Sequence, residues 1–296
     1  MLSKLFYCQN DSAVSADLER LRSALIKALQ ADYINVNVES CRPGGTLGLF
    51  FYANLDGDRK FIKTHLPGVS QRDNLVKEIA ILQILYGDIL FIKKLELLVE
   101  EVEHVFLMMD TLELVPEKPN IEIIREIINE YNSKLNYVEK GDIKSLFSYL
   151  QVCDEAIHAT EFLASERLIS MEIAHQTLWN IQRLAETTSP FLLCHGDLSN
   201  NNIMQKNGIN IVVDWEDALW GIRNYDLYYW LTFFDQRQYY SLIELKKYQI
   251  DIDECISSMT TIIITKSYLS YINGSSYNHS ISIDRRMAEV FNVAKI

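Results

Sequence analysis

Three residues near position 200 combine the side chains needed to hold a divalent cation and to accept a proton. Asp197 follows the apolar run 192–194, Asn202 lies five positions later, and Asp214 ends the apolar run 209–213. Carboxylate and amide oxygens are the ligands that Mg²⁺ prefers, and a second carboxylate can accept the proton of an attacking hydroxyl. This set suits phosphoryl transfer, in which catalysis consists largely of positioning and charge neutralisation.

The segment that carries these residues has the pattern of a β-hairpin. The dipeptide Asn207–Gly208 separates two apolar runs, and this dipeptide favours a two-residue turn between paired strands. We therefore expect Asp197, Asn202 and Asp214 to meet at one end of the paired strands. A metallophosphoesterase also combines His, Asp and Asn, but it needs several His ligands for two metals, and the six His of this chain are scattered.

The motif H-G-D-x-x-x-x-N, followed by a strand that ends in D-W-E, resembles the aminoglycoside phosphotransferase and choline kinase family of small-molecule kinases. His195, Asp197, Asn202 and Asp214 match that motif without insertion. The resemblance implies an α+β, two-lobed protein-kinase-like fold, with a β-rich N-terminal lobe and a mostly helical C-terminal lobe. It implies ATP and Mg²⁺ as cofactors, Asp197 as the catalytic base beside His195, and Asn202 and Asp214 as metal ligands.

A lysine and a glutamate upstream fit the same chemistry. Lys63 lies in an apolar strand and Glu78 in a helix, and a buried ammonium needs an opposite charge. The resemblance implies that this pair positions the nucleotide phosphates. Lys60 is the alternative candidate for binding the phosphates, and Lys77 is expected to be an ordinary surface residue.

Two further segments are expected to bind the nucleotide. Gly44, Gly45 and Gly48 lie between two strands, where they let the backbone approach phosphates closely; an ordinary hairpin turn would use the same residues. The segment 109–111 resembles the hinge between kinase lobes, which implies that Met109, Asp110 and Thr111 contact the adenine.

Residues after Asp214 are candidates for the substrate pocket. Glu216 and Asp217 could bind metal or a substrate amine, or could be surface residues, whereas we interpret Asp226 as structural, bonded to a helix terminus or to the catalytic-loop backbone. The segment 225–240 is rich in aromatic residues, most of them expected in the core, with one or two available for a cationic substrate.

The boundary between the two lobes is expected at Pro116 and Pro119. These residues divide a nucleotide-binding lobe, 1–115, from a helical lobe with the catalytic loop and substrate pocket, 116–296.

Hydrophobic periodicity predicts the remaining elements. Strands are expected over 33–39, 59–65, 91–100 and 102–109, and helices over 11–32, 74–85, 121–135, 143–163, 170–185, 225–240, 250–271 and 284–293.

Composition narrows the function classes. The net charge of −12 argues against nucleic acid as the partner and is compatible with a cationic substrate. Five Cys without a C-x-x-C pair indicate reduced thiols in the cytoplasm. No signal peptide and no run long enough for a membrane span is found in the sequence.

These observations predict a cytoplasmic, ATP- and Mg²⁺-dependent phosphotransferase that acts on the hydroxyl of a small molecule. Amino alcohols, aminoglycosides and sugars all suit such a site. The alternative is a kinase-fold nucleotide-binding or scaffold protein that has lost catalysis.

Overall fold

The computed structural model describes residues 11–41, 48–65, 69–139, 141–144, 146–274 and 281–293. The chain forms two compact units. Unit 1 comprises Met1–Lys118, Tyr137–Ser145 and Asn201–Asp217, and unit 2 comprises Pro119–Asn136, Leu146–Asn200 and Ala218–Ile296. The lobes expected from the sequence, 1–115 and 116–296, stay a prediction; of the second, residues 137–145 and 201–217 group with unit 1.

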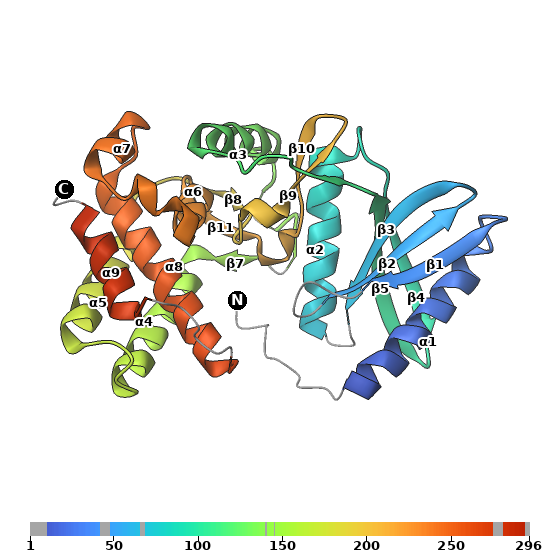
Figure 1. Cartoon of the computed structure of the whole chain (residues 1–296), viewed down its shortest axis with the longest axis horizontal. Helices are drawn as coiled ribbons and strands as arrows, with labels where there is room; N and C mark the ends of the chain where they lie inside the picture. Colours follow the sequence, from blue (N-terminus) through green and yellow to red (C-terminus); the bar gives the residue numbers. More distant parts are fainter. Residues whose placement is uncertain are drawn as a thin grey trace. The chain divides into compact units, whose positions relative to one another are not determined.

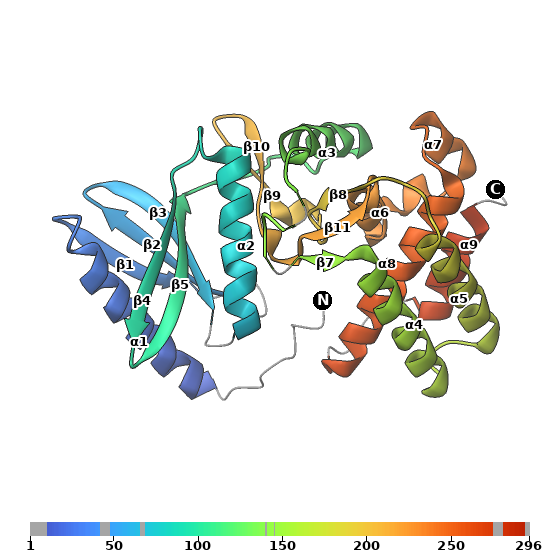
Figure 2. The same cartoon turned by 180° about the vertical axis from the view of Figure 1, so that it is seen from behind.

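Unit 1 is built on a five-stranded antiparallel sheet with the order β1-β2-β3-β5-β4 (Figure 1). Its strands are β1 (Val36–Cys41), β2 (Gly48–Leu55), β3 (Asp58–His65), β4 (Ile92–Val99) and β5 (Val102–Asp110), and its helices are α1 (Asp11–Leu29) and α2 (Val69–Tyr86). Both views show α1 and α2 on opposite faces of this sheet (Figures 1 and 2).

Alternation along β3 decides which side chains face each helix. Successive side chains of a strand point to opposite faces. Ile62 packs in the core under α1, with Leu25, Phe51 and Phe106. The neighbouring Lys63 therefore faces α2, where it contacts Glu78.

The predicted hairpin is confirmed within unit 1. Strands β9 (Ile203–Lys206) and β10 (Ile209–Val212) pair antiparallel, and β6 (Glu113–Leu114) joins them as a third strand. The turn residues Asn207 and Gly208 have φ values of 52° and 79°, which is the left-handed conformation that a two-residue turn requires. The 3-10 turn η2 (Trp215–Asp217) follows and packs against α2.

Unit 2 is mostly helical. Its helices are α3 (Ile121–Leu135), α4 (Tyr149–Ser165), α5 (Met171–Ala185), α6 (Tyr225–Leu231), α7 (Leu242–Lys247), α8 (Ile252–Ile272) and α9 (Ile283–Asn292), with a 3-10 helix η3 (Phe234–Tyr239). The largely buried α8 packs against α4, α5, α6 and α9. A small sheet, β7-β11-β8, combines β7 (Phe147–Ser148), β8 (Phe191–Cys194) and β11 (Leu219–Ile222). The short 3-10 turn η1 (Asn200–Asn202) precedes β9.

Several predicted boundaries differ from the structure, and the helix expected from residue 74 begins at Val69. The strand expected from residue 33 begins at Val36, because its partner β2 ends opposite it at Leu55, and Ile34 is 90% exposed. The helix expected from residue 143 begins after Ser148, whose side chain and Gln151 form a capping box. The aromatic helix ends at Leu231 and continues as η3.

Within the described part of the chain, none of the helices is both long and apolar enough to cross a membrane.

Candidate active site

Lys63 and Glu78 form the ion pair that the sequence predicted. The Lys63 ammonium lies 2.8 Å from Glu78 Oε2, and both side chains are buried. β3 supplies the lysine on its α2 face, and α2 presents the glutamate to it. A buried charge of either sign would be costly alone, so the pair makes both positions tolerable.

The same ammonium holds two further carboxylates from the end of the hairpin. Lys63 Nζ lies 2.8 Å from Asp214 Oδ1 and 2.7 Å from Glu216 Oε1. The backbone of Asp214 is left-handed, with φ of 67°, and its N–H donates to Glu78 Oε1 at 2.9 Å. Left-handed backbone is uncommon for a residue with a side chain, and here it turns the Asp214 carboxylate to the lysine.

His65 completes this cluster and was not singled out from the sequence. Its Nε2 lies 2.6 Å from Glu216 Oε1, and the ring is buried. The Glu216 carboxylate, which the sequence left open between metal or substrate binding and a surface role, is engaged by Lys63 and His65. The signal that could have found His65 is its position two residues after Lys63, on the same face of β3.

The pKa values of the cluster reflect its excess of negative charge. Burial lowers the pKa of Lys63, but Asp214, Glu78 and Glu216 together raise it well above its ordinary value. Burial raises the pKa of Glu78 in spite of the nearby ammonium. Burial also acts to raise the pKa of Glu216, but Lys63 and His65 hold it well below its usual range.

The donor set of this cluster fits a divalent cation. Oxygen atoms of Glu78, Asp214 and Glu216 all lie within 4.8 Å of one another, and three carboxylates face the one ammonium of Lys63. Hard oxygen donors with unbalanced negative charge suit Mg²⁺. Asn202, the other predicted ligand, lies opposite Val213, the residue before Asp214, and its backbone oxygen accepts the Val213 N–H at 2.9 Å.

Lys77 is buried, which corrects the prediction of a surface residue. Its exposed fraction is 1%, and the charges of Asp217 and Glu216, which belong to η2, act on it. Burial lowers the pKa of Lys77 to about 8, although Asp217, Glu216 and Glu78 act to raise it. Asp217 therefore belongs to the charge environment of a buried lysine.

In unit 2, Asp226 holds the loop that carries Asp197. Its two carboxylate oxygens accept the N–H groups of His195 at 2.8 Å and Gly196 at 2.9 Å, and Tyr131 also donates to it at 2.5 Å. Gly196 has φ of 85°, which glycine adopts without strain. The interpretation of Asp226 as a structural residue bonded to the loop backbone is confirmed.

His195 is fully buried, and its ring lies against the loop itself. Nδ1 accepts the N–H of Asp197 at 3.2 Å. This contact stabilises the turn that presents Asp197. The geometry supports a bracing role for His195 more than proton transfer.

Tyr229 is a contact of Asp197 that the aromatic pattern alone did not identify. Its phenol hydroxyl donates to Asp197 Oδ1. A second residue of α6, Trp230, donates to Asn200 Oδ1 at 2.8 Å, two residues from the end of the motif. The helix α6 therefore contacts the loop through several side chains.

The segment 109–111 is more closely bonded within unit 1 than expected. Met109 is buried and pairs with Phe61 on one side and Ile92 on the other. The Asp110 carboxylate binds Lys60 Nζ at 2.7 Å, the Phe91 N–H at 3.0 Å and the Lys206 ammonium.

The Asp110 side chain is thus bonded to other residues of unit 1, and Met109 is paired with strands on both sides. Thr111 lies just after the end of β5. The alternative phosphate ligand, Lys60, is bound to Asp58 at 2.6 Å and to Asp110. Lys63, in contrast, contacts Glu78, Asp214 and Glu216, which together are called the acidic cluster.

Among the predicted glycines, Gly48 begins β2, and a Cβ atom there would approach the Phe50 ring to 2.7 Å. A larger residue at position 48 would therefore require the Phe50 ring to shift. Gly44 and Gly45 lie outside the described residues.

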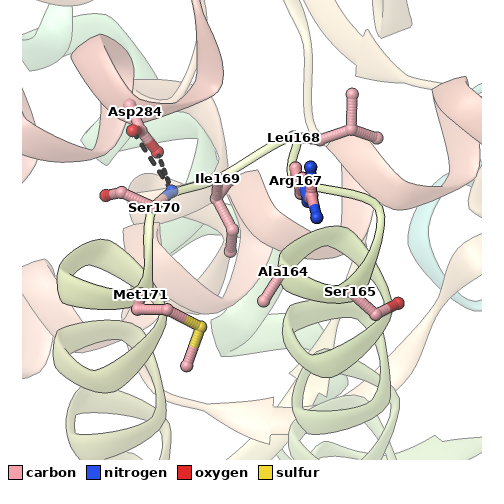
Figure 3. Close-up of a pocket in the computed structure, with 8 residues that line it drawn as sticks. All are labelled: Ala164, Ser165, Arg167, Leu168, Ile169, Ser170, Met171 and Asp284. Carbon is pink, nitrogen blue, oxygen red and sulfur yellow. Dashed lines mark hydrogen bonds between the residues drawn. The ribbon is translucent and has the colours of Figure 1, made fainter.

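A pocket in unit 2 is separate from every motif residue. It has a volume of about 520 Å³ and lies between the end of α4, the start of α5 and the start of α9 (Figure 3). Figure 3 shows the Ser170 N–H directed at both oxygens of Asp284, at 3.0 Å and 3.2 Å. These bonds join two helix N-termini, so we interpret the pocket as a by-product of helix packing.

Comparison with known proteins agrees with the motif. Residues 149–245 match the model of the phosphotransferase enzyme family, and this stretch contains the Asp197 loop and the hairpin. No curated protein sequence matches the chain significantly.

Solved structures of small-molecule kinases share the fold. The aminoglycoside phosphotransferase APH(4)-Ia is 15% identical, with a TM-score of 0.64 over 91% of this chain and 98% of that one. Spectinomycin phosphotransferase APH(9)-Ia is 12% identical, with a TM-score of 0.60 over 92% and 93%. The choline kinase LicA from Streptococcus pneumoniae is 14% identical, with a TM-score of 0.60 over 95% and 100%.

The predicted resemblance and the kinase-like α+β fold class are therefore confirmed. The matching family model also agrees with the predicted enzyme class, a small-molecule phosphotransferase.

Proposed function

We propose that this chain, with its phosphotransferase-family segment and kinase-like fold, transfers the γ-phosphoryl group of ATP to the hydroxyl of a small molecule. The observation that carries the proposal is the acidic cluster on Lys63. The cluster supplies a phosphate-binding lysine held by Glu78, and beside it the Asp214 carboxylate at the end of the hairpin. Asp197 follows the buried His195 on a loop held by Asp226.

Each side chain then has a defined task. Asp197 orients the acceptor hydroxyl and accepts its proton, while Lys63 binds phosphate oxygens. Asn202 and Asp214 would hold Mg²⁺, which supplies positive charge for the transferring group. Because the transition state of phosphoryl transfer is loose, positioning of the acceptor and charge neutralisation supply most of the rate.

Proteins of known structure with this fold bind or act on small molecules of several chemical classes. The similar structures include a complex with hygromycin B, a complex with spectinomycin and a choline kinase. We propose a small alcohol of the same range, either an amino alcohol, an aminoglycoside or a sugar. Nucleic acid is not proposed as a partner, because the chain carries a net charge of −12.

We place the reaction in the cytoplasm, where ATP and Mg²⁺ are abundant. All four cysteines among the described residues, Cys41, Cys153, Cys194 and Cys255, are free thiols. Unpaired thiols are typical of a reducing compartment.

Substitution Asp197→Asn tests the proposal directly. The amide keeps the size of the side chain but cannot accept the proton, so kcat should fall by about 10²- to 10⁴-fold. The assay measures phosphate transfer from γ-labelled ATP with Mg²⁺ to choline, ethanolamine, spectinomycin, hygromycin B and simple sugars.

The control for this variant is Asp88→Asn, which changes an exposed aspartate of unit 1 and should leave the rate unchanged. If Asp197→Asn retains the full rate, the assignment of Asp197 is wrong. If the wild-type protein binds MgATP but transfers phosphate to none of these acceptors and does not hydrolyse ATP, the alternative of a non-catalytic kinase-fold protein is favoured.

A further inference from the structure

We propose that Tyr229 is a positioning residue for Asp197, and that Lys266 strengthens this contact through the face of the Tyr229 ring. The inference rests on the proposed function, in which Asp197 is the catalytic base. It assigns roles to two residues of unit 2 that lie outside the H-G-D-x-x-x-x-N and D-W-E motifs.

The first observation is the bond between the two side chains. Tyr229 is buried in α6, and its hydroxyl donates to Asp197 Oδ1. A carboxylate has two oxygens and about four acceptor positions, so one phenol bond fixes its plane without using its capacity to accept a proton. The bond is charge-assisted, which makes it stronger than a bond between neutral groups.

The second observation is the position of Tyr229 relative to Asp226. The two residues are three positions apart on α6, and this spacing places side chains on the same side of a helix. Asp226 accepts the backbone N–H groups of His195 and Gly196, while Tyr229 binds the side chain of Asp197. One helix therefore fixes both the backbone of the loop and the carboxylate it presents.

The third observation is that the ammonium of Lys266 lies over the Tyr229 ring. Lys266 of α8 places Nζ 3.8 Å from the centroid of the Tyr229 ring and 4.3 Å from that of Phe233. The two rings meet edge to face, with centroids 5.9 Å apart. An ammonium over a ring is attracted to its electron-rich face.

This cation also changes the hydroxyl of the ring. It draws electron density from the phenol, and a phenol with less electron density is a stronger hydrogen-bond donor. Lys266 therefore acts on Asp197 through Tyr229. Packing of α6 against α8 holds the three side chains in this order.

Tyr229→Phe tests the positioning role, since it keeps the ring and the contact with Lys266 and removes the hydroxyl. Misplacement of a reacting group by about 1 Å costs up to about 10²-fold, so we expect kcat to fall by about 10- to 100-fold. The KM for ATP should stay close to that of the wild type, and the melting temperature should fall about as far as in the control Tyr228→Phe described below. The assay uses MgATP and the best acceptor of the panel above, or water as ATP hydrolysis if none is preferred.

The matched control is Tyr228→Phe. Tyr228 lies on the same helix, is buried, and donates its hydroxyl to Glu254 at 2.9 Å. This variant also loses a buried hydroxyl bond, but one that does not involve Asp197, so its kcat should not change.

Two further variants test the contribution of Lys266. Lys266→Met should lower kcat by less than Tyr229→Phe, and Lys266→Arg, which retains a cation that stacks on aromatic rings, should restore it. In the double variant Tyr229→Phe/Lys266→Met, kcat should equal that of Tyr229→Phe alone, because Lys266 acts through the missing hydroxyl.

Three results would overturn the inference. They are a wild-type kcat in Tyr229→Phe, an equal loss in Tyr228→Phe, and, for Lys266, losses that multiply in the double variant. If Asp197→Asn is inactive while Tyr229→Phe is fully active, this inference fails and the proposed function stands. If Asp197→Asn is fully active, the proposed function and this inference both fail.

Discussion

Lys63 gathers three carboxylates that come from distant parts of the chain. Glu78 arrives on α2, and Asp214 and Glu216 arrive after the hairpin. With three acids on one ammonium, the cluster retains negative charge that His65 offsets in part when it is protonated. At the scale of single residues, this imbalance leaves negative charge that a bound divalent cation would balance.

Lys77 gives the clearest expected pH dependence of stability. Its pKa is about 8 in the folded protein and about 10.5 in the unfolded chain, so the unfolded chain binds more protons between these values. The free energy of unfolding of the wild type should therefore rise by about 3 kcal/mol from pH 8 to pH 10.5 through this group. Below pH 8 the cost of burying the charge is fully present.

Chemical unfolding of wild type and Lys77→Met at several pH values measures this effect. We expect Lys77→Met to be the more stable protein at pH 7, by about 3 kcal/mol, and the difference to vanish near pH 10.5. The control Lys27→Met removes an exposed lysine of α1 and should show no such pH trend. A constant difference between wild type and Lys77→Met across this range would contradict the prediction.

At the scale of elements, Asp110 ties three strands of unit 1 together. It lies at the end of β5 and binds Lys60 of β3, Lys206 of β9 and the N–H of Phe91. The five-stranded sheet and the hairpin sheet are thereby joined where β5 ends. Burial raises the pKa of Asp110, but the bonds from Lys206, Lys60 and Phe91 outweigh it and lower the pKa to about 2.

Asp110→Asn should therefore reduce the free energy of unfolding by about 2 kcal/mol at pH 7. The contribution of Asp110 is present above its unfolded pKa of about 3.8 and is lost as the pH falls toward 2. Urea unfolding of both proteins from pH 7 to pH 2 should show the two stabilities converging at the acidic end. Asp88→Asn serves as the exposed control, and an Asp110→Asn protein as stable as that control at pH 7 would refute the role.

At the scale of the whole molecule, nucleotide binding should raise the melting temperature in a metal-dependent way. A ligand at 100 times its Kd stabilises the folded state by about 2.7 kcal/mol, which corresponds to a rise of several degrees for a chain of this size. We expect this rise with ATP and Mg²⁺ and a smaller rise with ATP and a chelator. Asp214→Asn should lose the Mg²⁺-dependent part of the rise.

Thermal unfolding of wild type, Asp214→Asn and the control Asp88→Asn measures these increments. Equal Mg²⁺-dependent rises in the wild type and in Asp214→Asn would exclude Asp214 as a metal ligand. The same experiment separates nucleotide binding from catalysis, because it requires no acceptor.

Local patterns in the sequence determined a large part of this protein. The Asn207–Gly208 turn and the order of Asp197, Asn202 and Asp214 follow from residue types at short spacings. The pairing of Lys63 with Glu78 was expected because a buried ammonium needs an opposite charge and because the motif resembles the kinase family. These features depend on alternation in strands and on helical repeat, which are properties of neighbouring residues.

The tertiary structure alone decided which distant groups meet. His65 and Glu216 are 151 positions apart, and Tyr229 and Asp197 belong to different elements. Lys77 is buried on α2, the helix against which η2 packs. Periodicity tells which face of an element is covered, but it does not identify the partner that covers it. The partner is set by long-range packing, and with it the charges and hydrogen bonds that distinguish a positioning residue from an ordinary core side chain.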